Sequence, residues 1–90
     1  MRVVETKRFS KALKKLLANG LDGRLVADAV RWLVNGRQPP CPSYRDHALG
    51  NNLKMWRELH LRGDLLLVYQ IEGDALILIL IGSHNQVFNK

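Results

Sequence analysis

Two neighbouring segments, residues 65–71 and 75–81, are nearly continuously apolar and are separated only by Glu72-Gly73-Asp74. Each has the length of a strand, and a short glycine-containing connection between two such segments is typical of a β-hairpin. Strands that lack polar alternation are usually buried on both faces. The sequence therefore predicts two central strands, with helices on one face of the sheet and a further segment covering part of the other.

Two amphipathic helices are expected before this hairpin. Thr6 can cap the first helix, whose apolar residues recur at helical spacing until the stop signal Asn19-Gly20. Asp22 can cap the second helix, which extends to about Val34 before Asn35-Gly36. The apolar stripes of both helices need a sheet or another helix to cover them.

The remaining segments complete the expected order. They are a short strand at residues 2–5, a proline-rich extended connection at 36–53, a strand at 54–61 and a short tail from residue 82. The order is β-α-α-β-β-β within a single domain, residues 1–90. The predicted fold class is α+β, with two N-terminal helices packed on a mainly antiparallel sheet.

The chain is strongly basic. Fourteen Lys and Arg residues face eight Asp and Glu residues among 90, which gives a net charge of +6. A surface with this excess attracts phosphates, so we expect a polyanionic partner such as RNA. The hydrophobic fraction of 47% is too high for a disordered chain.

Cysteine content and hydropathy indicate the compartment. Cys41 is the only cysteine, which excludes an internal disulfide and favours a reducing cytoplasm. The longest apolar run, residues 75–81, is too short for a membrane-spanning helix, which needs about 20 residues. No secretory signal pattern is present at residues 1–20. We expect a cytoplasmic protein that does not associate with membranes.

Three histidines are the candidate catalytic residues: His47, His60 and His84. Histidine exchanges protons near neutral pH. RNA cleavage by internal transesterification needs a base for the 2′-hydroxyl and an acid for the leaving 5′-oxygen. The histidines and the nearby Asp64 provide these groups without a metal ion.

Each histidine also has a structural interpretation. His47 could cap a turn, His60 could make a hydrogen bond on a strand face, and His84 could lie in the tail. Zinc binding is a further alternative for the three histidines and Asp64. Since neither His-x-His nor HExxH spacing occurs, we predict no metal site and no other cofactor.

Basic residues form two groups. The first helix carries five, which could be a solvated face or could bind nucleic acid or an acidic partner. Arg57 lies three residues from His60, so a regular strand places the two on opposite faces, and only a bulge or strong twist would bring both to one phosphate. The residues expected to bind RNA phosphates near the histidines are Arg45, Lys54, Arg57 and Arg62.

The motifs of the C-terminal half, taken in order, resemble those of a known family. They are Tyr44-Arg45-Asp46-His47-Ala48-Leu49, Trp56-Arg57-Glu58-Leu59-His60, Asp64-Leu65-Leu66-Leu67-Val68-Tyr69, and Gly82-Ser83-His84 followed by Phe88. With this series the chain resembles the YafQ-type toxins of the RelE/ParE toxin–antitoxin superfamily. The two preceding helices fit the same pattern.

This resemblance implies a RelE-like fold and a bacterial type II toxin. Such a toxin is an mRNA endoribonuclease, or mRNA interferase, that acts on the ribosome, inhibits translation and is neutralised by a cognate antitoxin protein. The resemblance assigns His84 as general acid, and leaves the base as His60, Asp64 or His47, with Asp64 alternatively orienting an imidazole. The motif positions it marks as catalytic are His47, His60, Asp64 and His84; Phe88 matches an aromatic that stacks on a base.

One residue departs from the motifs, and two other functions remain open. Glu58 stands where a close relative carries aspartate, which keeps the charge on a longer side chain. Arg57 would stabilise the phosphate if it reached the histidines.

Gyrase-poisoning members of the superfamily lack this histidine set, which favours RNA cleavage. The alternatives are a ribosome-independent ribonuclease and a non-catalytic RNA-binding or protein-binding module.

Overall fold

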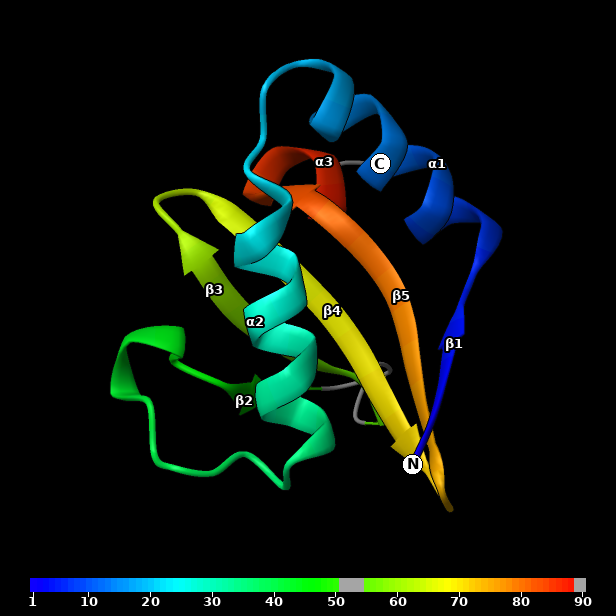
Figure 1. Cartoon of the computed structure of the whole chain (residues 1–90), viewed down its shortest axis with the longest axis vertical. Coiled ribbons are helices and arrows are strands. Elements are labelled where there is room, and N and C mark those ends of the chain that lie inside the picture. Colours follow the sequence, from blue (N-terminus) through cyan, green and yellow to red (C-terminus); the bar gives the residue numbers. More distant parts are fainter. Residues whose placement is uncertain (51–54, 89–90) are drawn as a thin grey trace.

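The computed structural model describes residues 1–50 and 55–88. Figure 1 shows the chain as helices on a twisted sheet. The elements in chain order are β1 (Arg2–Glu5), α1 (Lys7–Ala18), α2 (Gly23–Val34), the 3₁₀ turn η1 (Pro42–Tyr44), β2 (His47–Ala48), β3 (Arg57–Arg62), β4 (Leu65–Glu72), β5 (Ala75–Ser83) and α3 (His84–Phe88).

The strands form one mixed sheet in the order β1-β5-β4-β3-β2. β1 pairs with β5 in parallel, and the other neighbouring strands are antiparallel. The apolar strands β4 and β5 are inner strands, as their sequences require. The predicted α+β class, with two helices on a mainly antiparallel sheet, is confirmed.

Two local caps begin the long helices. Thr6 Oγ1 accepts a hydrogen bond from the Phe9 N–H at 3.0 Å and donates to the Ile79 carbonyl at 2.8 Å, which ties α1 to β5. Asp22 Oδ1 accepts from the Arg24 N–H at 3.0 Å at the start of α2. The buried core between these helices and the sheet consists of Phe9, Val26, Ala29, Leu33, Leu59, Leu61, Leu67, Tyr69, Leu76, Leu78 and Ile81.

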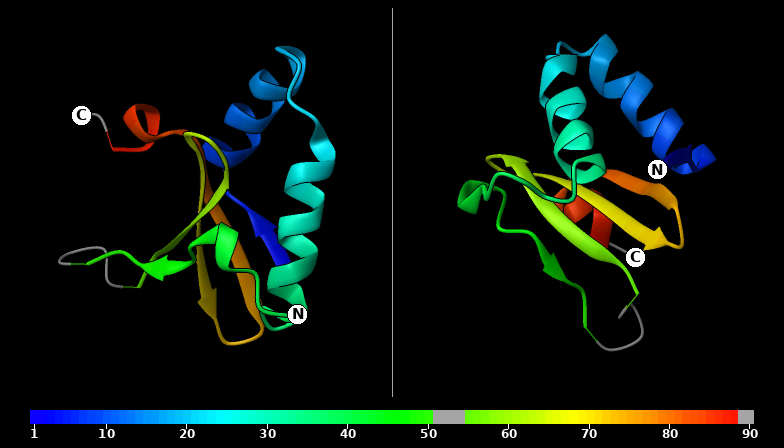
Figure 2. Two further views of the ribbon diagram at one scale, coloured as in Figure 1. Left: turned by 90° about the vertical axis from the view of Figure 1, so that its left-hand side faces the viewer. Right: turned by 60° about the horizontal axis from the view of Figure 1, so that its bottom comes forward.

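The other face of the sheet carries a smaller apolar cluster built on Val68, Ile79 and Leu80. Trp56 and Val87 pack against it, from the segment before β3 and from α3. Figure 2 (left) shows α1 and α2 on one side of the sheet and α3 on the other, with β2 at the edge of the sheet. The expectation that a further segment covers part of this face is confirmed.

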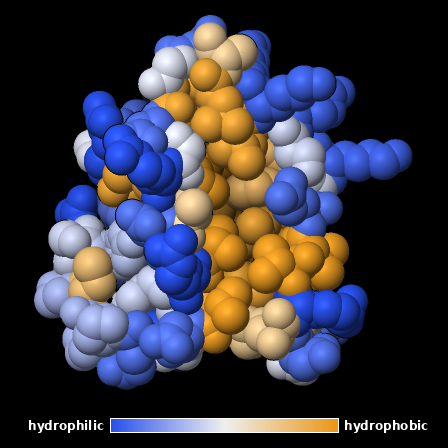
Figure 3. All heavy atoms as spheres, in the orientation of Figure 1, coloured by the Kyte–Doolittle hydropathy of each residue, from blue (hydrophilic) through white to orange (hydrophobic). Residues whose placement is uncertain are grey.

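The helix face is incompletely covered. Figure 3 shows a band of apolar side chains between α1 and α2 that continues onto the sheet. The large apolar residues that remain exposed include Val3, Val4, Leu17 and Val34. No helix within residues 1–50 and 55–88 has the length and apolar character needed to cross a membrane.

Three segments differ from the sequence prediction. The connection 36–53 contains η1 and β2 in its described part, and the strand expected at 54–61 covers 57–62. In the tail expected from residue 82, residues 82 and 83 are the end of β5 and α3 follows. Ser83 Oγ accepts from the Gln86 N–H at 3.2 Å while Gln86 Oε1 accepts from the Ser83 N–H at 2.8 Å. This reciprocal capping box starts the helix, and the Ser-x-x-Gln spacing was its signal.

Candidate active site

One row of side chains crosses the sheet on the face away from α1 and α2. Leu59 points into the core under the helices, so the alternating Glu58 and His60 face the other way. His60 pairs with Leu66 of β4, and Leu66 pairs with Gly82 of β5. Directly opposed residues share a face. The row therefore leads from His60 to the end of β5, where α3 begins.

His47 lies on the edge strand β2, opposite Glu58. Its Nδ1 is 2.7 Å from the Arg45 carbonyl oxygen, and its Nε2 is 3.4 Å from Glu58 Oε1. Since a carbonyl oxygen only accepts hydrogen bonds, Nδ1 carries a proton toward Arg45. Glu58 is buried, with 4% of its surface exposed, and its carboxylate lies within ion-pair distance of the His47 ring. The imidazole is thus fixed with Nε2 toward a buried carboxylate.

His60 lies beside His47. The two ring centroids are 6.3 Å apart and the ring planes differ by 29°, a stacked arrangement. His60 is half-buried, and its buried Nδ1 has no hydrogen-bond partner in the part of the chain that the structure describes. Buried polar atoms normally have a partner. The orientation of this ring therefore depends on packing and on the stacked His47.

His84 and Asp64 meet at the other end of the row. The backbone N–H of His84 donates to Asp64 Oδ1 at 3.2 Å, and the His84 ring lies against Phe88 with centroids 4.8 Å apart. α3 packs closely on the sheet at Gly82. The contact is so close that a Cβ added at Gly82 would lie only 2.8 Å from Gln86 Oε1. This contact places α3 over the same face as His60. His84 and Asp64 are exposed.

A network of charged and polar groups lies directly behind His47, on the helix side of the sheet. Arg57 Nη2 donates to Asp46 Oδ2 at 2.9 Å, and Arg57 Nε donates to the Tyr69 hydroxyl at 3.2 Å. The Tyr69 hydroxyl donates to Asp46 Oδ1. Arg37 Nη1 adds a longer contact to Asp46 at 3.4 Å. The side chain of Asp46 is 10% exposed, so it is a nearly buried carboxylate with several donors.

Burial and pairing shift the protonation of this network. Burial by itself would raise the pKa of the Asp46 carboxyl, but hydrogen bonds from Arg57 and Tyr69 outweigh it and hold the pKa below its ordinary value. Burial and the hydrogen bond to Asp46 raise the pKa of Tyr69 to about 12. At neutral pH the network therefore holds a carboxylate, a guanidinium and a neutral phenol.

The residues expected to bind RNA are dispersed. Arg57 contacts Asp46 behind the sheet, opposite the histidines, as the strand alternation indicated. Arg45 is exposed next to His47 in a left-handed conformation, φ 47°, and Arg62 is exposed at the end of β3. Lys54 lies outside the described residues.

Sequence reasoning left three residues out of the site. Asp46, Glu58 and Tyr69 were visible only as parts of motifs, and none was given a role of its own. Glu58 lies between His47 of β2 and Val68 of β4, and a buried carboxylate there needs a nearby cation or donor. The signal in the sequence was the alternation that places Glu58 on the same strand face as His60.

Together these residues form two groups on one face, joined by the row from His60 to Gly82. The first group contains His47, Glu58 and His60; the second contains Asp64, His84 and Phe88. Each group contains an imidazole, a side chain that exchanges protons near neutral pH. Among the described residues, no three His, Cys, Asp or Glu side chains come together as a metal site.

Comparison with known proteins gives the family. Residues 1–89 match the family described as bacterial toxin of type II toxin–antitoxin system, YafQ. The chain belongs to this YafQ family of type II toxins. A putative YafQ toxin of Haemophilus influenzae is 34% identical, and the match covers 100% of this chain and 94% of that protein. The mRNA interferase toxin YafQ of Escherichia coli is 27% identical over 90% and 88% of the two chains.

Solved structures of the family have the same fold. A metal-bound toxin from Helicobacter pylori is 43% identical and superposes with a TM-score of 0.90, covering 98% of this chain and 99% of that one. YafQ in the E. coli DinJ–YafQ complex is 26% identical, with a TM-score of 0.89 and coverage of 99% and 100%. The fold and the toxin family agree with the resemblance seen in the sequence.

Proposed function

We propose that this toxin is an mRNA endoribonuclease that cuts mRNA on the ribosome by metal-independent histidine acid–base chemistry. The observation that carries the proposal is the placement of two histidine groups on one face of the sheet, joined by the row from His60 to Gly82. The E. coli relative with the name mRNA interferase toxin supports the same activity.

The reaction is a transesterification within the RNA. A base in the His47–His60 pair takes the proton of the 2′-hydroxyl, and the 2′-oxygen attacks phosphorus. The bond from phosphorus to the 5′-oxygen breaks, and His84 protonates that oxygen. The products are a 2′,3′-cyclic phosphate and a 5′-hydroxyl. Phe88, which lies against the His84 ring, stacks on a base and places the phosphate between the two groups.

Asp64 has a different part in this proposal. Its Oδ1 accepts from the His84 backbone N–H, not from the imidazole. It therefore holds the first residue of α3 in place and leaves the His84 ring free to donate its proton.

The decisive experiment compares cleavage by the wild type and the His84→Ala variant. We expect His84→Ala to reduce cleavage of mRNA on translating ribosomes by about 10²–10⁴-fold, the usual contribution of a general acid. Asn85→Ala, an exposed neighbour on α3, is the matched control and should leave the rate unchanged. Equal cleavage by His84→Ala and wild type would end the general-acid assignment.

Two further assays separate the alternatives. Cleavage of purified RNA without ribosomes, at the rate seen on ribosomes, would identify a ribosome-independent ribonuclease. Salt-sensitive RNA binding with no cleavage products under either condition would identify a non-catalytic binding module.

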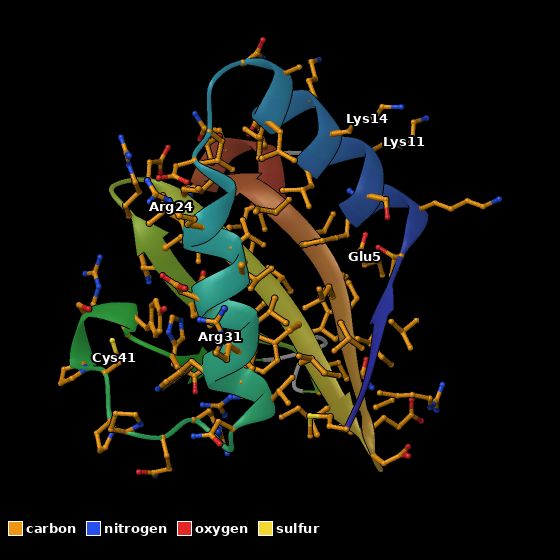
Figure 4. All side chains as sticks on the ribbon, viewed as in Figure 1. Glu5, Lys11, Lys14, Arg24, Arg31 and Cys41 are labelled. Carbon is orange, nitrogen blue, oxygen red and sulfur yellow. The ribbon has the colours of Figure 1, made fainter. Side chains whose placement is uncertain are left out.

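The charge distribution supports binding to the ribosome, whose surface is rich in RNA phosphates. The helix α1 contributes five positive charges and no negative one to a net charge of +6. Figure 4 shows Lys11 and Lys14 pointing away from the sheet. In α2, by contrast, Arg24 and Arg31 pair with Asp22 and Asp28. Within the described residues no carboxylate forms an ion pair with the α1 cations, so α1 dominates the positive field.

A pocket connects this charged helix to α3. Its volume is about 340 Å³, and it lies where α1, β5 and α3 meet. The side chains of Arg8, Lys11 and Lys15 line one wall and Gln86 of α3 lines another. Phosphates bound along α1 would therefore lie next to the helix that carries His84.

The contribution of α1 is testable by charge reversal. We expect Lys11→Glu with Lys14→Glu to weaken ribosome association and to lower the magnitude of its salt slope by about 1–2, as lost phosphate contacts do. Arg24→Glu with Arg31→Glu makes the same change of charge on α2 and is the control. Equal losses from the two double variants would show a general charge effect with no special role for α1.

We also propose a cognate antitoxin as the protein partner. The relative in the DinJ–YafQ complex supports such a partner. The exposed apolar band between α1 and α2, beside the basic α1, suits an amphipathic acidic segment. Val34→Asp should weaken capture of the antitoxin encoded beside this toxin and leave cleavage by the free toxin unchanged. Full capture by the variant would remove α2 from this interface.

A further inference from the structure

The strand that carries His47 is too short to hold that residue by itself. β2 has two residues, and its only neighbour among the described strands is β3, through the pairs His47–Glu58 and Ala48–Arg57. Both β2 residues are exposed. A backbone hydrogen bond contributes about 1 kcal/mol net, so a two-residue edge strand is easily frayed. A further anchor must fix its position.

Asp46 is that anchor. It immediately precedes His47, and its carboxylate accepts from Arg57 on β3 and from Tyr69 on β4. These partners lie 11 and 23 residues away in the sequence. Tyr69 is fully buried, so the anchor is connected to the hydrophobic core.

The two faces of the sheet explain how the anchor acts on the histidine. Asp46 contacts Arg57 behind the sheet, and the next residues of the two segments, His47 and Glu58, meet in front of it. Successive side chains of an extended segment point to opposite faces. Fixing Asp46 therefore fixes the direction of His47, and the stacked ring of His60 depends on His47 in turn.

We propose that Asp46, Arg57 and Tyr69 form a positioning network that sets the orientation of His47 and, through it, of His60. This inference deepens the proposed ribonuclease function and rests on it. Arg57 is thereby a positioning residue: its Nη2 and Nε both donate to Asp46 or Tyr69 on the face opposite the histidines.

The test is Asp46→Asn, which keeps the shape of the side chain and removes its charge. We expect kcat for mRNA cleavage to fall about 100-fold, the scale of a loss of geometry of about 1 Å, with KM little changed. The His47 ring should also lose its contact with His60, measured by NMR as loss of ring-to-ring NOEs. Adding His47→Ala to Asp46→Asn should cause no loss beyond that of His47→Ala alone.

Controls separate positioning from instability and from RNA contact. Asp74→Asn removes an exposed carboxylate 3.7 Å from Arg2 and should change neither rate nor spectrum. Tyr69→Phe, a milder change, should give a smaller kcat loss in a folded protein. Arg57→Lys should lower kcat if it positions His47, whereas a role in RNA contact would appear as a raised KM.

The inference and the proposed function can fail separately. A wild type that cuts no RNA would remove the function, while the NMR comparison would still measure the His47 ring. A folded Asp46→Asn variant with wild-type His47 signals and wild-type kcat would overturn the positioning network. Additive losses in the Asp46→Asn, His47→Ala double variant would also overturn it.

Discussion

His47 and His84 stand at opposite ends of the candidate site and are held in different ways. Behind His47, the nearly buried carboxylate of Asp46 bonds to Arg57 and Tyr69, which lie 11 and 23 residues from it in the sequence. His84 lies on α3, which is held by the capping box between Ser83 and Gln86, by one contact to Asp64 and by Val87 on the smaller apolar cluster. We therefore expect the His47 end to unfold with the core and the His84 end to open locally without global unfolding.

Under the proposed function, this difference would give one small domain both a fixed and an adjustable catalytic group. A base that must meet a 2′-hydroxyl gains from rigid placement. In the same proposal, His84 is an acid on a five-residue helix at the surface, and it could adjust to bound RNA. The two ends should respond differently to substitution and to pH.

The largest expected effect is on the His47 end. Asp46→Ala should lower the free energy of unfolding by about 2–4 kcal/mol, because it leaves Arg57 without its partner in a mostly buried network. Asp74→Ala, at an exposed ion pair, should cause no measurable change. Urea denaturation measures both. If the two variants were equally stable, the His47 end would not be coupled to the core.

A smaller and local effect is expected at the His84 end. Ser83→Ala removes the cap of α3 and should cost at most about 1 kcal/mol of global stability. Amide exchange should accelerate in α3 and stay unchanged in β3 and β4. Faster exchange throughout the sheet would contradict the local character of this end.

The pH dependence gives the finest distinction, because among the residues described at the two ends only those at the His47 end include buried or nearly buried titratable groups. The pKa of Asp46 is lowered in the folded state, so its contribution is present above the unfolded pKa of about 3.9 and is lost as pH falls further. The pKa of Tyr69 is raised to about 12, so its contribution is present below the unfolded value of about 10 and is lost as pH rises.

These shifts can be measured as differences between variants. The difference in free energy of unfolding between wild type and Tyr69→Phe should shrink to zero as pH rises from 10 toward 12. The ultraviolet absorbance of tyrosinate should show Tyr69 ionising only near pH 12. The gap between wild type and Asp46→Asn should close below pH 4. The gap for Ser83→Ala should be flat across the whole range, and a pH-dependent gap there would remove the contrast.

Much of the fold followed from local sequence signals. The capped helices and the apolar hairpin predicted α1, α2, β4 and β5, because each has a strong periodicity or a continuous apolar run. β2 has no such signal: two residues acquire strand geometry only because β3 and Asp46 hold them. α3 had a signal in Ser83-His84-Asn85-Gln86, but a five-residue helix is too short to show a periodicity.

The site was predictable in composition but not in connectivity. The motifs pointed to the histidines and to Asp64, whose roles remain predictions. The alternation of β3 correctly separated Arg57 from His60. The partner of Arg57 could not be derived, since the contacts to Asp46 and Tyr69 depend on how the segment before β2 folds back against the sheet.

The parallel pairing of β1 with β5 affects how the chain folds. The Thr6 hydroxyl reaches the carbonyl of Ile79 across 73 positions, whereas the β4–β5 hairpin closes through a turn of two residues. Closing a longer loop costs more chain entropy, about 0.6 kcal/mol for each doubling of its length. We therefore expect the hairpin to form early and β1 to dock late, so that the open edge of β5 is the last part of the sheet to be protected during refolding.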